Sequence, residues 1–375
     1  MTPFALRPSA APRWVKCGGY VSMTTKHPER PLFNLVREEG NAFHSVAAIV
    51  AKGERAPEVG ALIGDNVDYD ETMADHVAEY VEEIRSWGTP AFIEQPMACS
   101  YIHEQCGGTP DGWTFDVQRR KIRLIDAKYG YRPVDPVGCL QLGCYLAGIL
   151  ERLVSMGIPM NGLHEQHWDA EFIIYQPRGR NVGFKRWEFN IAEYARGLFN
   201  ILRHGAHAAM TPGAPLCAGP HCLDCSAAAD CPALRANVGG LIDVLDVTHS
   251  DTLSALELGF ELDLLDYAES IIKARKEALT IEGEYRISKG HDIPGRKMSA
   301  NPGRRRWKEG CEAQVIQMAA MLGYGDITAP TKPITPTQAI PIIGQAMVEQ
   351  FSYRPTGKLK LAPITAADIR KAFGK

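Results

Sequence analysis

Two aspartates and a lysine form a pattern that could hold a metal ion. Asp111 follows a proline, and Asp126-Ala127-Lys128 ends the apolar run that begins at Ile122. In a strand alternate side chains leave the same face, so Asp126 and Lys128 would lie together. If residues 107–130 form a hairpin, Asp111 on the partner strand would bring a second carboxylate. Paired carboxylates hold hard cations such as Mg²⁺, and a nearby lysine suits phosphodiester hydrolysis.

The alternative interpretation is a surface hairpin whose charges are simply solvated. Two features favour the metal site instead. Asp126 emerges at the end of a strand that reads as buried, which is a common place for α/β active sites. The Pro110–Asp111 pair stands at a workable distance upstream.

A turn over residues 217–231 carries four cysteines. Cys222, Cys225 and Cys231 have the spacing C-x2-C-x5-C, and Cys217 precedes them. Four thiolates can hold tetrahedral zinc or a [4Fe–4S] cluster, with Cys217 as a possible fourth ligand. Buried cysteines acting as small apolar residues are the alternative. We interpret the cysteines in apolar or strand contexts as core or incidental residues: Cys99, Cys106, Cys139, Cys144 and Cys311.

A basic strip with one aromatic residue lies further along the chain. Basic side chains neutralise phosphates, and an aromatic ring can stack on an unpaired base. The strip therefore predicts a DNA-binding segment, although a solvated hairpin with a packed tryptophan is the alternative. Its residues are Arg304, Arg305, Arg306, Trp307 and Lys308.

The bulk composition is that of a soluble globular protein. The 375 residues are 45% apolar and 23% charged, and a net charge of -3 gives no global attraction to nucleic acid. No apolar run is long enough to span a membrane, and no signal peptide is recognisable. We therefore expect a protein of the host-cell cytoplasm, where ten cysteines favour metal binding or free thiols over disulfides.

Periodicity and turn residues indicate which elements position these side chains. The order of helices, strands and a crossover helix predicts an α/β fold with a mixed sheet. We predict an irregular segment over 1–35, strand character over 91–105, a hairpin over 107–130 and a strand pair over 168–178 and 182–190. The predicted helices span 34–53, 70–88, 136–157, 191–210, 251–281 and about 310–322. A boundary near 240 would separate a first domain, 1–240, from a helical and irregular extension, 241–375.

In order along the chain, these motifs resemble the RecB-like branch of the PD-(D/E)XK nucleases. Asp111 and Asp126-Ala127-Lys128 match the motif that names the superfamily. Gln141-Leu-Gly-Cys-Tyr145 resembles the Q-x-x-x-Y motif of the branch, and Gly40-Asn-Ala-Phe-His44 resembles its G-x-x-x-H motif. The resemblance implies a restriction-endonuclease-like core, a mixed sheet flanked by helices.

The resemblance also implies a role for each matched residue. Asp111, Asp126 and the Ala127 carbonyl would hold Mg²⁺ or Mn²⁺, with His44 as an auxiliary ligand. Lys128 would be catalytic, Gln141 would orient the substrate or the metal site, and Tyr145 would belong to the same site. Glu94 is a weaker candidate for an acidic position of the family. Glu79 and Glu82 read as a solvated helix face.

Nucleases of this branch that carry an iron–sulfur cluster have three cysteines after the core and one far upstream. This resemblance implies a [4Fe–4S] cluster on Cys17, Cys222, Cys225 and Cys231, with zinc and Cys217 as the alternatives. Over most of the chain, the sequence resembles a phage- and prophage-borne nuclease family, on residues 7–20, 126–130, the cysteine turn, 293–298 and 304–308. We therefore expect a DNA exonuclease of recombination or end processing, whose partners are DNA and a phage single-strand annealing or recombination protein. Its oligomeric state stays open. The alternative is a catalytically silent DNA-binding or assembly module with a zinc staple.

Overall fold

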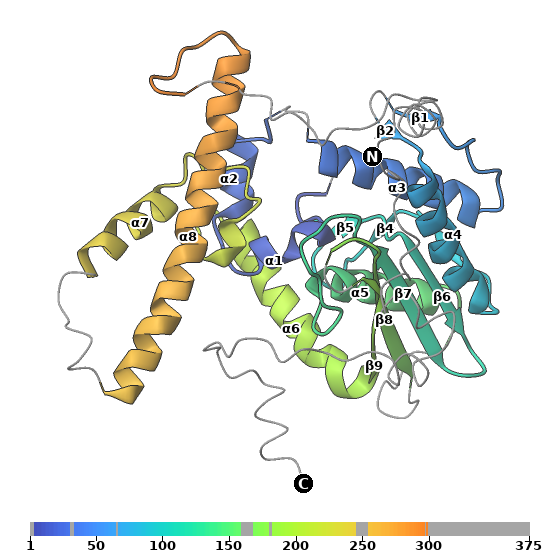
Figure 1. Ribbon diagram of the computed structural model, residues 1–375. Coiled ribbons are helices and arrows are strands. Elements are labelled where there is room, and N and C mark those ends of the chain that lie inside the picture. The colour runs from blue at the N-terminus through green and yellow to red at the C-terminus, as the bar shows by residue number, and fades with distance from the viewer. Residues whose placement is uncertain are drawn as a thin grey trace, which may run out of the picture. The chain divides into compact units, whose positions relative to one another are not determined.

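The computed structural model describes residues 4–30, 34–64, 67–158, 168–179, 182–244, 254–296 and 298. Contacts divide the chain into a first unit, residues 1–297, and a second unit, residues 298–375. Every described helix and strand lies in the first unit (Figure 1). The boundary predicted near residue 240 falls inside helix α7, Pro232–Val244. None of the described helices is long and apolar enough to cross a membrane.

A mixed five-stranded sheet with the order β3-β6-β7-β8-β9 confirms the predicted α/β class (Figure 1). The predicted hairpin is β6 and β7, which pair antiparallel with Gly112 opposite Ile125. Strand β7 pairs parallel with β8, and helix α5 makes the crossover between them. The strands are β3 (Phe92–Ile93), β6 (Gly112–Asp116), β7 (Lys121–Ala127), β8 (Asp169–Gln176) and β9 (Gly183–Asn190). Two small sheets pair β1 (Leu62–Ile63) with β2 (Val67–Asp68), and β4 (Met97–Ala98) with β5 (Gly107–Gly108).

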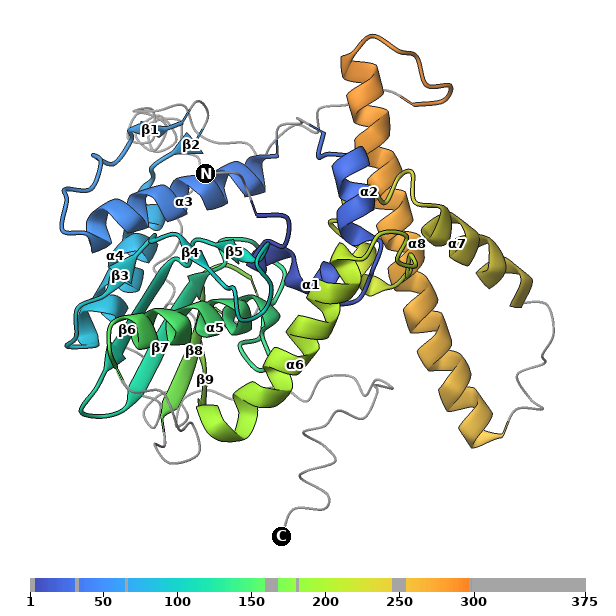
Figure 2. The same ribbon diagram turned by 180° about the vertical axis from the view of Figure 1, so that it is seen from behind.

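Alternate residues of β7 are buried on opposite faces of the sheet, which helices cover on both sides (Figures 1 and 2). Ile122 and Leu124 pack in one core cluster with α5 and α6, and Ile125 and Ala127 pack in another with α3 and α4. Asp126 therefore faces α5. These four helices confirm the predicted ones: α3 (Leu35–Ala51), α4 (Glu71–Ser86), α5 (Leu140–Ser155) and α6 (Ile191–Met210).

Side-chain caps explain where three of these helices begin. Asn34, Asp70 and Asn190 each accept hydrogen bonds from backbone N–H groups in the first turn of the helix that follows. Such caps satisfy donors that have no partner inside the helix. Helix α4 then buries the apolar stripe that its spacing predicts, namely Met73, Val77, Tyr80, Val81 and Ile84.

Two predictions, an irregular segment over residues 1–35 and a strand over residues 91–105, are wrong in detail. Residues 1–35 contain η1 (Pro8–Ala10), α1 (Ala11–Trp14) and α2 (Tyr20–Lys26). Pro8 and Pro12 stand in the first turns of η1 and α1, where a missing N–H is tolerated. Trp14 is fully buried. The strand predicted over 91–105 is reduced to β3 and β4, because Glu94 adopts a left-handed φ of 50° that interrupts the extended chain.

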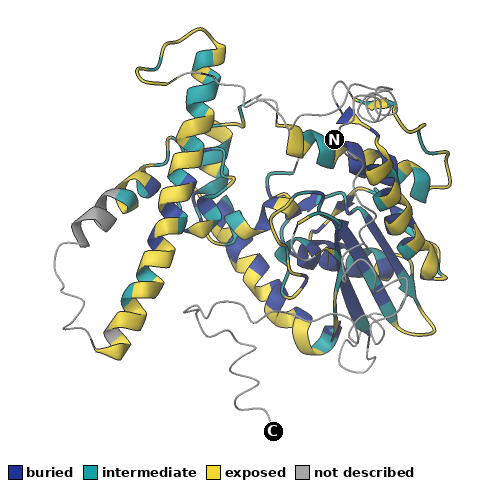
Figure 3. Ribbon diagram, viewed as in Figure 1, coloured by how far each residue is buried: buried dark blue, intermediate teal, exposed yellow. Residues whose placement is uncertain are grey.

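The cysteine turn packs against two further helices. Cys222 of η2 (Pro220–Cys222) shares a small core with Leu234 of α7 and Ile271 of α8 (Ala255–Ser288). Helix α8 runs beyond the predicted end at 281, and Figure 3 shows much of it exposed. The helix predicted at about 310–322 lies outside the described residues.

Gly148 lets helix α5 approach the β4 strand closely. A Cβ built there would lie 2.6 Å from the Ala98 carbonyl oxygen. Gly148→Ala should therefore lower the free energy of unfolding by about 1–3 kcal/mol through overpacking. At Gly197, in α6, such a Cβ would lie more than 4 Å from every described atom outside its own stretch of helix, so Gly197→Ala should raise that free energy by up to about 1 kcal/mol. Denaturant unfolding of both variants checks this; equal stability of Gly148→Ala and the wild type would contradict it.

Candidate active site

Three carboxylates line up at one edge of the sheet, at the ends of neighbouring strands. Asp111 directly precedes β6 and Asp126 lies at the end of β7, so the hairpin register sets them side by side. Glu94 directly follows β3, and its backbone N–H donates to the Asp111 carbonyl at 3.2 Å. The convergence of Asp111 and Asp126 that the hairpin predicted is thus present.

Asp126 is at the centre of a network that links it to α5. Its Oδ1 accepts a hydrogen bond from Gln141 Nε2 at 2.6 Å, and its Oδ2 lies 2.8 Å from Lys128 Nζ as an ion pair. Lys128 Nζ also donates to Gln141 Oε1 at 2.9 Å. Asp126 is only 2% exposed. Gln141 therefore holds both the carboxylate and the ammonium group in fixed positions.

Asp111 is held by backbone and by a histidine. Its Oδ2 accepts from the Ala127 backbone N–H at 2.7 Å and lies 3.4 Å from His44 Nδ1. His44 comes from α3, so an element outside the sheet completes this side of the site. Ligand atoms of His44, Glu94 and Asp111 all lie within 4.8 Å of one another. One nitrogen and two carboxylates in such a set can coordinate a divalent cation.

Crowding of like charges shifts the pKa values of these groups. Burial, helped by the Asp111 carboxylate, raises the pKa of Glu94 to about 7. Burial also raises the pKa of Asp126, and Asp111 adds to the effect against the pull of Lys128. Burial alone would lower the pKa of His44, but Asp111 outweighs it and raises the value to about 9. The carboxylates at this edge are thus crowded, and the raised pKa values of Glu94 and Asp126 reflect their repulsion by Asp111 as well as their burial.

A cleft of about 340 Å³ opens onto this edge. It is lined by His44, Asp111, Asp126, Lys128 and Gln141, and also by Tyr145 and residues of the N-terminal segment, Arg7, Pro8 and Ser9. The Tyr145 hydroxyl donates to the Thr109 carbonyl at 3.0 Å, so Tyr145 fixes the approach to β6. All the residues predicted for the catalytic and metal sites therefore lie together.

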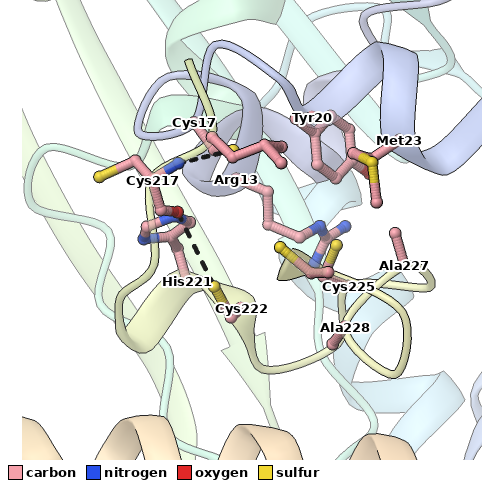
Figure 4. Close-up of a pocket in the computed structure, with 12 residues that line it drawn as sticks. Arg13, Cys17, Tyr20, Met23, Cys217, His221, Cys222, Cys225, Ala227 and Ala228 are labelled. Carbon is pink, nitrogen blue, oxygen red and sulfur yellow. Dashed lines mark hydrogen bonds between the residues drawn. The ribbon is translucent and has the colours of Figure 1, made fainter. Parts of the chain in front are cut away.

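A second pocket gathers the cysteines (Figure 4). Cys17, on the loop after α1, lines it together with Cys222, Cys225 and Cys231. The Cys217 backbone N–H donates to Cys17 Sγ at 3.5 Å, and the Gly219 N–H donates to Cys222 Sγ at 3.4 Å. Burial raises the pKa of the Cys17, Cys222 and Cys225 thiols. The N-terminal cysteine and the distant turn are thus neighbours.

Cys217 also lines the pocket but differs from these four residues. It is exposed, and the one hydrogen bond that its thiol donates among the described residues is to the neighbouring Ala218 carbonyl, at 3.8 Å. Figure 4 shows its sulphur pointing away from the pocket. Within the core, Cys99, Cys106 and Cys144 are fully buried, as predicted for core residues.

A family comparison covers both sites and nearly the whole chain. Residues 5–370 match the family model described as "Protein of unknown function (DUF2800)". The chain belongs to the DUF2800 family. The family description names no function, so the chemistry of this DUF2800 protein has to be inferred from the geometry of its site.

Two features of the DUF2800 site went beyond the sequence predictions. On the sequence alone Glu94 is only a weaker candidate, and its place beside Asp111 follows from a two-residue strand that periodicity does not reveal. Arg7 lines the cleft, although no sequence motif predicts a role for it. The only sequence signal for Arg7 is its place in the segment that leads to Cys17.

The predicted DNA-binding strip lies outside the described residues: Arg304, Arg305, Arg306, Trp307 and Lys308.

Proposed function

We propose that this protein is a metal-dependent DNA nuclease that hydrolyses phosphodiester bonds, and that it acts from DNA ends as an exonuclease. The observation that carries the proposal is the pairing of Asp111 with Asp126 at one sheet edge, beside the Lys128 ammonium. Two carboxylates that can hold a metal ion, with a lysine in the same cleft, suit the hydrolysis of a phosphodiester. The exonuclease assignment rests on the resemblance to the RecB-like branch.

The donor set fits Mg²⁺ or Mn²⁺. Asp111 and Glu94 offer carboxylate oxygens, and His44 offers a ring nitrogen, with their ligand atoms all within 4.8 Å of one another. Asp126 and the Ala127 carbonyl complete the proposed ligands. When bound, the ion would neutralise phosphate charge and lower the pKa of a coordinated water. The crowding of carboxylates described above favours such a cation.

The chain's own residues fix the positions of the catalytic groups and supply a hydrogen-bond donor for the substrate. Gln141 bonds both Asp126 and Lys128, so the carboxylate and the ammonium cannot rotate apart. Lys128 can then donate a hydrogen bond to a phosphate oxygen that enters the cleft, which stabilises the charge that develops there. Tyr145 anchors the loop before Asp111 through the Thr109 carbonyl.

We assign the second pocket to a [4Fe–4S] cluster on Cys17, Cys222, Cys225 and Cys231. Backbone N–H groups that donate to cysteine sulphurs are typical of such sites. Arg13 also lines the pocket; its Nη2 donates to the Ser9 carbonyl at 3.4 Å, whereas its buried Nε has no hydrogen-bond partner in the part of the chain described. A buried N–H without a partner beside the pocket suits a site whose thiolates carry negative charge. Zinc is the rival occupant.

We further propose that the enzyme serves phage recombination or DNA end processing in the cytoplasm of the host cell. Its partners would be DNA and a phage single-strand annealing or recombination protein. This setting rests on the resemblance to phage-borne nucleases alone.

Digestion of end-labelled linear, circular and single-stranded DNA tests the function, with Mg²⁺, with Mn²⁺ and with a chelator. Linear DNA should be degraded with either metal, circular DNA should survive, and the chelator should stop cleavage until metal is restored. Linear DNA that stays intact with both metals would refute the nuclease and favour the catalytically silent module. Cleavage of circular DNA would refute only the exonuclease assignment.

A further inference from the structure

The N-terminal segment reaches the cleft and is fixed there. Leu6 is fully buried and forms a parallel bridge with Cys106, and its N–H donates to the Gln105 carbonyl at 3.0 Å. Pro8 is also buried, and a Cβ at Gly108 would lie 3.0 Å from the Pro8 ring. The segment is thus packed against β5, next to the predicted catalytic residues.

The backbone of Arg7 is held between these two anchors. Its carbonyl accepts hydrogen bonds from Trp14 Nε1 at 3.0 Å and from the Ala10 N–H at 2.9 Å. Trp14 is fully buried, so its indole cannot move away. The base of the Arg7 side chain therefore stays in place at the cleft wall without help from its own guanidinium.

The guanidinium itself differs from the other cations of the cleft. His44 and Lys128 each face a carboxylate, at 3.4 and 2.8 Å. Arg7 is exposed, and its side chain forms no ion pair or hydrogen bond with any residue in the described ranges. An arginine fork presents donors that match two phosphate oxygens. Because its backbone is fixed and its guanidinium has no partner among the described residues, Arg7 is suited to bind an external anion.

We propose that Arg7 binds a backbone phosphate of the nucleic acid and positions it over the carboxylates. The inference rests on the proposed nuclease function and extends it, because it assigns substrate binding to a residue outside the nuclease motifs. Contact with one phosphate would be independent of base sequence. It would also release counterions, which makes its contribution depend on salt.

The test compares Arg7→Ala, Arg7→Lys and a matched control, Arg119→Ala. Arg119 is exposed in the β6–β7 turn, at the far end of the hairpin from Asp126. On linear DNA with Mg²⁺, Arg7→Ala should lower kcat/KM roughly 10- to 100-fold. Arg7→Lys should recover part of this loss, since it keeps the charge but not the fork. Arg119→Ala should match the wild type.

A binding measurement separates phosphate contact from a structural effect. In the Asp126→Asn background, which should leave the DNA intact, the slope of log K against log salt should become shallower by about 0.7 to 0.9 when Arg7 is alanine. A wild-type kcat/KM and slope for Arg7→Ala would overturn the inference, as would an equal loss in Arg119→Ala. If Asp126→Ala also cleaves like the wild type, the nuclease proposal itself fails.

Discussion

Replacing Asp126 with alanine should lower Mg²⁺-dependent DNA cleavage by about 10³-fold or more, because the change removes a proposed metal ligand and releases Lys128 and Gln141 from their shared partner. Lys128→Ala should have an effect of the same order, since no other described ammonium group lines the cleft. Single-turnover cleavage of labelled linear DNA at saturating Mg²⁺ measures both losses.

Two controls separate chemistry from folding. Asp126→Asn keeps the size of the side chain, so it should fold like the wild type and remain inactive. Asp116, at the other end of β6, accepts a hydrogen bond only within its turn, and Asp116→Ala should keep full activity. Wild-type cleavage by Asp126→Ala or Lys128→Ala, with the fold verified by circular dichroism, would exclude the proposed catalytic centre.

Replacement of Cys222 with serine should remove the visible absorbance that the proposed [4Fe–4S] cluster would give the purified protein, and should destabilise the first unit. Cys17 and Cys222 are about 205 residues apart, so a site that joins them closes a long loop. Loop-closure entropy gives about 5 kcal/mol for such a staple, which corresponds to a fall in Tm of roughly 10 to 20 °C. Cys17→Ser should behave in the same way.

Cys217→Ser is the matched control, because that exposed thiol points away from the pocket. It should keep the absorbance and the Tm of the wild type. Metal and sulfide analysis of anaerobically purified protein identifies the occupant. A colourless protein with stoichiometric zinc would replace the iron–sulfur assignment, and loss of metal in Cys217→Ser but not in Cys17→Ser would exchange the fourth ligand.

Local sequence patterns were sufficient to predict the strand and the helix at the centre of the fold. The alternation along residues 121–127 determines both the strand and the face that Asp126 occupies, because one face is buried against α5 and the other against α3 and α4. Gln141 and Tyr145 lie one helical turn apart on α5, which brings both to the cleft. Short-range periodicity therefore located most of the site.

Two residues of the cleft region, Arg7 and Glu94, are positioned by long-range pairing that local sequence patterns do not reveal. Arg7 reaches the cleft only because Leu6 pairs with Cys106, about 100 residues away. Glu94 reaches it because it follows a two-residue strand and adopts a left-handed backbone conformation. Such backbone strain is common at active sites. No local propensity predicts either contact, because tertiary packing decides both.

The partnership of Cys17 with residues 217–231 also sets an order of events during synthesis. All the cleft residues, from Arg7 to Tyr145, have left the ribosome before Cys231, the last cysteine of the pocket, is translated. A nascent chain that ends after α6 would hold a complete cleft, but Cys17 would lack its partners. Capture of the proposed inorganic cofactor must therefore be one of the last steps in the maturation of this unit, after its sheet has been made.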